Sequence, residues 1–175
     1  MRAVTTTVLA AAILSSAAAG AASGATAPSR RTIVRAVATA ERSRALWATV
    51  NICSSRRDPD SLGIRGQMPT LGFPATLEMR IQVNYWSPAG KRFVAIHSAT
   101  AMKTLALGQQ AGGLQQDGAI FPFSAHAGRL NATITFTWTR AGKVLGRVAR
   151  RTTAGHPTAN YGSPPHYSAA QCTIK

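Results

Sequence analysis

Residues 130–140, Leu-Asn-Ala-Thr-Ile-Thr-Phe-Thr-Trp-Thr-Arg, alternate between apolar and polar side chains along their whole length. The two alternating sets are Leu130, Ala132, Ile134, Phe136 and Trp138 on one face, and Asn131, Thr133, Thr135, Thr137 and Thr139 on the other. Only a period of two sorts the residues in this way, so the segment is predicted to be a half-buried β-strand. The large apolar side chains need a second layer to cover them, which indicates a packed β-domain.

Other segments carry similar strand signals. Residues 75–86 also alternate, residues 87–90 form a turn sequence, and residues 91–97 are expected to return as the hairpin partner. Further strands are predicted at 46–53, 100–107, 119–124, 143–151 and 169–174, with loops at 54–66, 108–118 and 152–165. About seven or eight short strands with no ordinary helix between them favour an all-β, antiparallel sandwich over a parallel α/β fold.

The N-terminus has the pattern of a secretory signal peptide. Arg2 supplies a positive charge, and residues 4–19 are uncharged and mostly apolar or small. Small-x-small cleavage sequences occur at 19–21 and 25–27. The apolar run is too short and too rich in Ala and Thr for a stable membrane span. We therefore expect a signal peptide at 1–27 and an exported mature protein without a transmembrane span.

The rest of the chain divides into a basic arm and the predicted domain. Residues 28–45 hold five arginines and one acidic residue, and their apolar residues do not form one clear stripe. The segment is therefore predicted to be a linker or a short helix, and to remain mobile. Residues 46–175 contain all the predicted strands and are expected to form the β-sandwich domain.

Cys53 and Cys172 are the two cysteines of the chain. Outside the cytoplasm an even count favours a disulfide, and two free buried thiols are the alternative. In the chain-entropy model, a bridge closing a loop of about 120 residues stabilises the fold by roughly 4–5 kcal/mol. Two cysteines cannot form a structural zinc site by themselves, and no histidine lies at ligand spacing from either, so no metal or cofactor is expected.

The charge balance is strongly basic. The formal net charge is +15, from 20 Lys and Arg against five Asp and Glu. This balance favours association with polyanions and disfavours chemistry that needs paired carboxylates. The candidate anion-binding residues are Arg30, Arg31, Arg35, Arg42 and Arg44 in the arm, and Arg147, Arg150 and Arg151 after the last predicted hairpin turn. The competing interpretation is a solvated surface whose arginines reflect the nucleotide composition of the source.

No catalytic constellation is evident. The histidines are His97, His126, His156 and His166, and no carboxylate is placed to orient any of them. Asp117, Ser124 and His126 are neighbours in sequence, but nothing fixes them as a triad. A loop that holds His156 and His166 offers no third metal ligand.

The acidic residues and the threonine row also have ordinary explanations. A glycosidase pair would have to combine Glu78 with Asp117 or Asp58. The sequence from Asp58 to Asp60 lacks the remaining ligands of a calcium loop. An ice-binding or sugar-binding threonine face would need a matching row on the neighbouring strand, where Glu78 and Arg80 stand instead.

Three segments, residues 46–53, 151–156 and 163–172, resemble a family of secreted actinobacterial proteins, and the resemblance covers most of residues 45–175. It implies an immunoglobulin-like sandwich with this one disulfide, and no assigned activity or site. We therefore predict a secreted, non-enzymatic β-sandwich that binds an anionic cell-surface polymer or another extracellular protein. A secreted hydrolase that uses a loop histidine, and a secreted protease inhibitor, are the alternatives.

Overall fold

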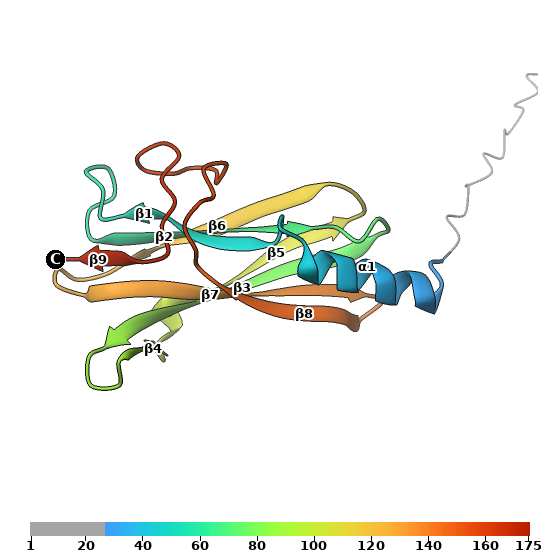
Figure 1. The fold of residues 1–175 in the computed structure, drawn as a ribbon, viewed down its shortest axis with the longest axis horizontal. Coiled ribbons are helices and arrows are strands. Elements are labelled where there is room, and N and C mark those ends of the chain that lie inside the picture. Colours follow the sequence, from blue (N-terminus) through green and yellow to red (C-terminus); the bar gives the residue numbers. More distant parts are fainter. Residues whose placement is uncertain (1–26) are drawn as a thin grey trace, which may run out of the picture.

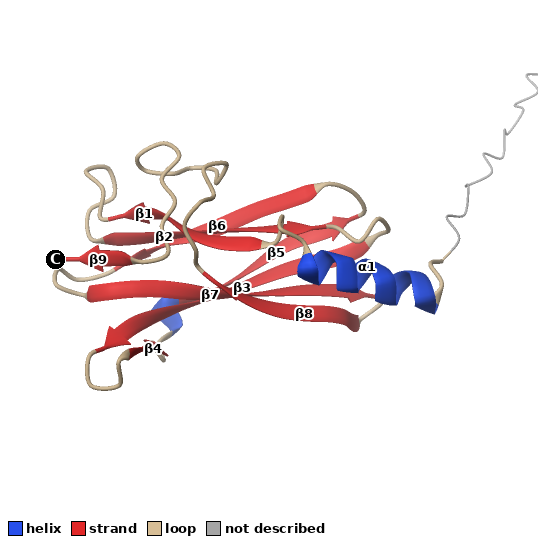
Figure 2. Cartoon of the chain, in the orientation of Figure 1, coloured by secondary structure: helices blue, strands red, loops and turns tan. Residues whose placement is uncertain are grey.

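The computed structural model describes residues 27–175 and shows a mostly β protein with two antiparallel sheets and one α-helix (Figures 1 and 2). The predicted signal peptide falls on residues outside this range, apart from residue 27. A three-stranded sheet has the order β1 (Trp47–Cys53), β2 (Ser61–Pro69) and β6 (Leu114–Pro122). The six-stranded sheet consists of β3 (Ala75–Ser87), β4 (Arg92–Ala95), β5 (Met102–Gln110), β7 (Gly128–Arg140), β8 (Lys143–Arg151) and β9 (Cys172–Ile174).

Strands β3 and β7 form the centre of the six-stranded sheet and confirm the predicted alternation. Strand β7 pairs with β3 and β8, and its N-terminal end pairs with β9. The five apolar side chains of β7 are at most 1% exposed. They pack with the inward residues of β3 and of β2, so a single core lies between the two sheets. Burying each large apolar side chain contributes about 1.5–3 kcal/mol.

The core also contains a hydrogen bond that joins the two sheets. Trp138 is fully buried, and its indole Nε1 donates to the carbonyl oxygen of Pro69, at 2.8 Å. A buried indole N–H without a partner would be costly, so this bond makes tryptophan compatible with the centre of the core.

Strand β2 is the principal correction to the predicted strands, because the sequence pattern placed a loop at 54–66. Gly63 and Gly66 fall within this predicted loop, but both are close-packing positions inside the strand. A Cβ on Gly66 would lie 2.8 Å from Cδ1 of Ile134, and one on Gly63 would lie 2.6 Å from Cβ of Ile52. Glycine is needed where neighbouring side chains fill that space.

The predicted loop at 108–118 is also wrong at both ends. Strand β5 continues to Gln110 and strand β6 begins at Leu114, so only a tight connection separates them. The residues of β6 are largely polar or small because this strand lies at the edge of its sheet, next to β2 only. Edge strands do not need a continuous apolar face.

The basic arm contains helix α1 (Arg30–Arg42), which packs against β8 at the end of the sandwich opposite the C-terminus (Figure 1). The hydroxyl of Ser29 caps the helix by accepting a hydrogen bond from the backbone N–H of Thr32. Of the two structures predicted for the arm, the short helix is therefore the one observed.

The expectation of a mobile arm is wrong, because α1 has an apolar stripe that docks on the domain. Its members recur at helical spacing and are Ile33, Ala36, Val37 and Ala40. Two of them are alanines, whose small side chains weaken the stripe in sequence but allow close packing. Gly146 of β8 lies directly beneath Val37.

Within residues 27–175, no helix has the length and the apolar composition that a membrane-spanning helix requires.

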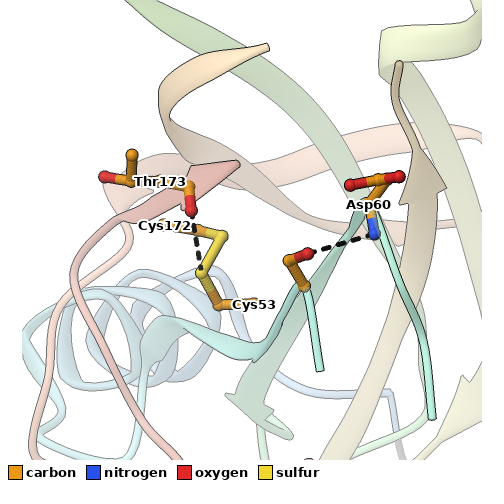
Figure 3. Close-up of a disulfide and its surroundings, with 5 residues drawn as sticks. Cys53, Asp60, Cys172 and Thr173 are labelled. Carbon is orange, nitrogen blue, oxygen red and sulfur yellow. Dashed lines mark hydrogen bonds between the residues drawn. A yellow bond between two sulfur atoms is a disulfide. The ribbon is translucent and has the colours of Figure 1, made fainter. Parts of the chain in front are cut away.

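The disulfide is confirmed, since Cys53 and Cys172 are bonded with their Cα atoms 5.3 Å apart. It joins the end of β1 to the start of β9 (Figure 3). Nearby, the backbone N–H of Asp60 donates to the hydroxyl of Ser54, which holds the turn that leads into β2 (Figure 3). The bridge therefore ties the two ends of the β-domain together.

The long segment between β8 and β9 runs along the free edge of β1 and reaches over the outer face of the three-stranded sheet, where Tyr161 lies against Arg65 of β2 (Figure 1). Val50 and Ala169 exchange two backbone hydrogen bonds of 2.9 Å. The backbone N–H of Ser163 donates to the carbonyl of Asn51, also at 2.9 Å. These bonds hold the segment against β1.

Candidate functional site

The outer face of the six-stranded sheet carries a row of polar side chains from two strands. Because alternate residues of β7 face the core, the intervening residues face outward. Antiparallel register places each beside an outward residue of β3: Thr137 beside Glu78, Thr135 beside Arg80, Thr133 beside Gln82, and Asn131 beside Asn84. Together with Arg147 of β8, most of these side chains line an open groove of about 540 Å³.

Hydrogen bonds organise one end of this groove. Asn84 and Asn131 are only 8% and 6% exposed, and the amide of Asn84 donates to the amide oxygen of Asn131, at 2.9 Å. The amide of Gln82 donates to the carbonyls of Val83 and Ile96, at 2.8 and 3.0 Å. These bonds fix the amide groups, so the groove presents hydroxyl and amide groups in set positions.

The charge of the groove is positive. Arg80 and Arg147 line it, and Arg151 lies beside Thr133 in register, on the same outward side of the sheet. Glu78 is the one acidic side chain in the lining. In the part of the chain that the structure describes, the single ion pair within 4.0 Å joins Arg65 to Asp117. Arg80 and Arg147 in the groove, and Arg151 beside it, therefore make no ion pair among residues 27–175, and the one hydrogen bond of Arg80 is a weak one to the sulfur of Met102, at 3.6 Å.

The arginines after the hairpin do not act as one cluster. Arg147 and Arg151 face outward, but Arg150 lies opposite Ile134, whose side chain points into the core. The guanidinium of Arg150 donates to the carbonyls of Glu41 and Ala149. Arg150 therefore attaches α1 to β8 through its bond to Glu41.

The five arginines of the arm are all exposed. Arg31, Arg35 and Arg42 share one side of α1, opposite the docked stripe, because they are spaced by four and seven residues. A shallow depression of about 570 Å³ between α1 and residues 69–72 includes Arg31 and Arg35. These arginines thus form a second basic surface, separate from the groove.

Arg80 lines the groove, although it is not among the arginines predicted to bind anions. In the sequence it stands apart from both arginine clusters, in the segment that forms β3. Its place beside Thr135 depends on a pairing between residues 55 positions apart. The available signal was the alternation of β3, which puts Glu78, Arg80 and Gln82 on one face.

The histidines are dispersed. His156 stacks on Trp47 with ring centroids 4.7 Å apart, and its Nε2 lies 2.9 Å from the hydroxyl of Thr153. Burial lowers the pKa of His156 from its ordinary value. A ring nitrogen of His166 lies 3.0 Å from the carbonyl of Pro157, and His97 and His126 are exposed. Across residues 27–175, no three His, Cys, Asp or Glu side chains converge as a metal site would require.

The residues considered as a triad are not brought together. Asp117 lies five positions before the end of β6, a span of about 17 Å at the usual rise of a strand. Its carboxylate accepts a hydrogen bond from the backbone N–H of Gly118 and lies 3.7 Å from Arg65. Ser124 and His126 follow the far end of that strand.

A scan against protein-family models gives no match, and a search of curated proteins finds no significantly similar sequence. The groove offers arginines for anions and fixed hydroxyl and amide groups for hydrogen bonding.

Proposed function

We propose that the protein is an exported binding module and that the groove on the six-stranded sheet binds an anionic, hydroxyl-rich polymer. The observation that carries the proposal is that Arg80 and Arg147 line the same open groove as a row of threonine and amide side chains. Guanidinium groups bind carboxylates and phosphates through paired, charge-assisted hydrogen bonds. Threonine hydroxyls and amides match the hydroxyls of a polysaccharide or a polyol phosphate.

The shape of the groove favours an extended ligand. It is open and follows the strands, and its threonines, from Thr133 to Thr137, extend about 14 Å at the rise of a β-strand. Aromatic side chains do not contribute to its lining, so ring stacking does not supply the affinity. Binding would depend mainly on charge and should weaken as the salt concentration rises.

Export and an immunoglobulin-like arrangement belong to the same proposal. Support for export comes from the leader-like N-terminal sequence and from the Cys53–Cys172 disulfide, since such bonds persist in oxidising compartments. Two facing antiparallel sheets around one core support the immunoglobulin-like arrangement. An anionic polymer of the cell envelope is the partner that this combination favours.

The test is a binding titration with oligogalacturonate, an anionic polysaccharide, and with neutral dextran of similar length. The double variant Arg80→Ser/Arg147→Ser should weaken oligogalacturonate binding at least tenfold. The control Arg42→Ser/Arg44→Ser removes the same charge from exposed positions in or just after α1 and should change the affinity by less than about twofold, because exposed charges far from a ligand are screened by salt.

Three results would count against the proposal. Equal losses in the two double variants would mean that net charge alone attracts the polymer. Equal binding of neutral dextran and anionic oligogalacturonate would show that the arginines do not bind the anionic groups of the polymer. An absence of binding to oligogalacturonate at low salt would exclude this class of anionic polysaccharide as the ligand.

A further inference from the structure

A second pocket lies on the opposite side of the sandwich, between the three-stranded sheet and the segment that covers it. Its volume is about 530 Å³, within the usual range for small-molecule sites. Arg65 of β2 lines it, together with Ile120 of β6 and Tyr161 of the covering segment. The pocket is therefore formed jointly by the three-stranded sheet and the segment between β8 and β9.

Within residues 27–175, Arg65 and Arg129 are the two arginines whose Nε is buried with no hydrogen-bond partner. The side chain of Arg65, the one of the two that lines this pocket, is only 13% exposed. Its nearest carboxylate oxygen, on Asp117, is 3.7 Å from Nη1, which is beyond a good hydrogen bond. Burial lowers the pKa of Arg65, and the Asp117 carboxylate partly offsets this. A cation held in this way gains from an acceptor that reaches it within the pocket.

Apolar surface lies beside this cation. Tyr161 is 79% exposed and Ile120 is 53% exposed, so both offer apolar area to a ligand. The guanidinium carbon of Arg65 lies 5.0 Å from the centre of the Tyr161 ring. A molecule that places an anionic group at Arg65 can therefore rest its body against the ring and the isoleucine.

The covering segment holds Tyr161 in a fixed and strained conformation. The backbone of Tyr161 has a φ of 58°, a left-handed value that is uncommon for a bulky residue. The side-chain amide of Asn51 donates to the carbonyls of Asn160 and Tyr161, at 3.0 and 3.2 Å. Strain that the surrounding structure maintains is typical of binding sites, and here it positions one wall of the pocket.

We propose that this pocket binds a small organic monocarboxylate with an aromatic or branched apolar body. The carboxylate would pair with Arg65, and the apolar body would lie between Tyr161 and Ile120. A doubly charged phosphate fits less well, because Arg57 and Asp58 of the lining offset each other's charge and Asp117 lies beside the guanidinium of Arg65. The Asp117 carboxylate repels a dianion more strongly than a monoanion.

The experiment compares 3-phenylpropionate with its neutral amide, 3-phenylpropionamide, by NMR titration of the whole exported protein. The wild type should bind the carboxylate at least tenfold more tightly than the amide. Arg65→Met keeps the apolar stem and should abolish this difference. Tyr161→Ala should weaken both ligands, because it removes the apolar wall that they share.

The control is Arg80→Met, which removes one charge from the polymer groove on the other sheet and should leave the preference for the carboxylate intact. Spectra of each variant without ligand show whether the fold is retained, and Tyr161→Ala tests the site even if Arg65→Met unfolds. Equal binding of acid and amide to the wild type, binding of neither up to their solubility limits, or equal losses in Arg65→Met and Arg80→Met would each overturn the proposal.

Discussion

Replacing Gly146 with alanine should destabilise the protein if α1 packs closely on β8, and should have little effect if α1 is only loosely attached. A Cβ at this position would lie 2.4 Å from Cγ1 of Val37 and 3.2 Å from Oε1 of Glu41. The first distance is far inside van der Waals contact, and Val37 is only 8% exposed, so its side chain has little room to move away. Overpacking of this kind costs about 1–3 kcal/mol.

A compensating substitution at Val37 should relieve this overlap. Val37→Ala alone removes two nearly buried methyl groups and should cost roughly 1.5–2.5 kcal/mol, counting their burial and the space they leave. In the double variant Val37→Ala/Gly146→Ala, the new methyl group occupies part of that space. The double variant should therefore be more stable than the sum of the two single effects by about 1 kcal/mol or more.

The measurement is urea unfolding followed by tryptophan fluorescence for the wild type, both single variants and the double variant. Gly112→Ala is the matched control, because a Cβ at Gly112 meets nothing within 4 Å. Its effect should stay within about 0.5 kcal/mol, as for most exposed substitutions. If Gly146→Ala is as mild as Gly112→Ala, or if the costs of Val37→Ala and Gly146→Ala simply add, α1 does not pack on β8.

Two other predictions concern the disulfide and His156. Replacing Cys53 and Cys172 together with serine should lower the free energy of unfolding by roughly 2–5 kcal/mol, measured by urea unfolding in the absence of reductant; an unchanged midpoint would contradict the role assigned to the bridge. Burial lowers the pKa of His156 in the folded state, so its unfolded form binds protons more readily, and the stability it contributes should be present above about pH 6.5 and decline as the pH falls below that value. His156→Gln should reduce the difference in urea midpoint between acidic and neutral pH, whereas an identical difference in the variant and the wild type would show that other groups cause it.

The centre of the fold was predictable because periodicity alone carries the information. In β7 and β3 the polar and apolar sets alternate without interruption, and burial of one set requires a strand at those residues. Strand β2 was not predicted, because glycine is required at positions 63 and 66 by side chains that pack against the backbone there. Those neighbours, Ile52 and Ile134, belong to other strands, so no local pattern distinguishes these glycines from turn residues.

The candidate sites were less predictable than the fold, because each depends on contacts between distant residues. Arg147 was identified from its cluster, but Arg80 becomes its neighbour only through the register of β3, β7 and β8. Arg65 shows no local signal at all. Its pocket exists because the segment after β8 returns across the three-stranded sheet and brings Tyr161 over it.

The two proposed sites lie on the outer faces of opposite sheets, with the shared core between them. Arg80 and Arg65 therefore lie on opposite sides of the molecule, and each ligand should bind without displacing the other. A polymer attracted only by the net charge of +15 would behave differently, because it would collect at any basic surface, including the exposed arginines of α1. Saturating oligogalacturonate should consequently leave the affinity for 3-phenylpropionate unchanged at fixed ionic strength. Competition between the two would mean that both respond to the overall charge of the protein and that neither face has its own site.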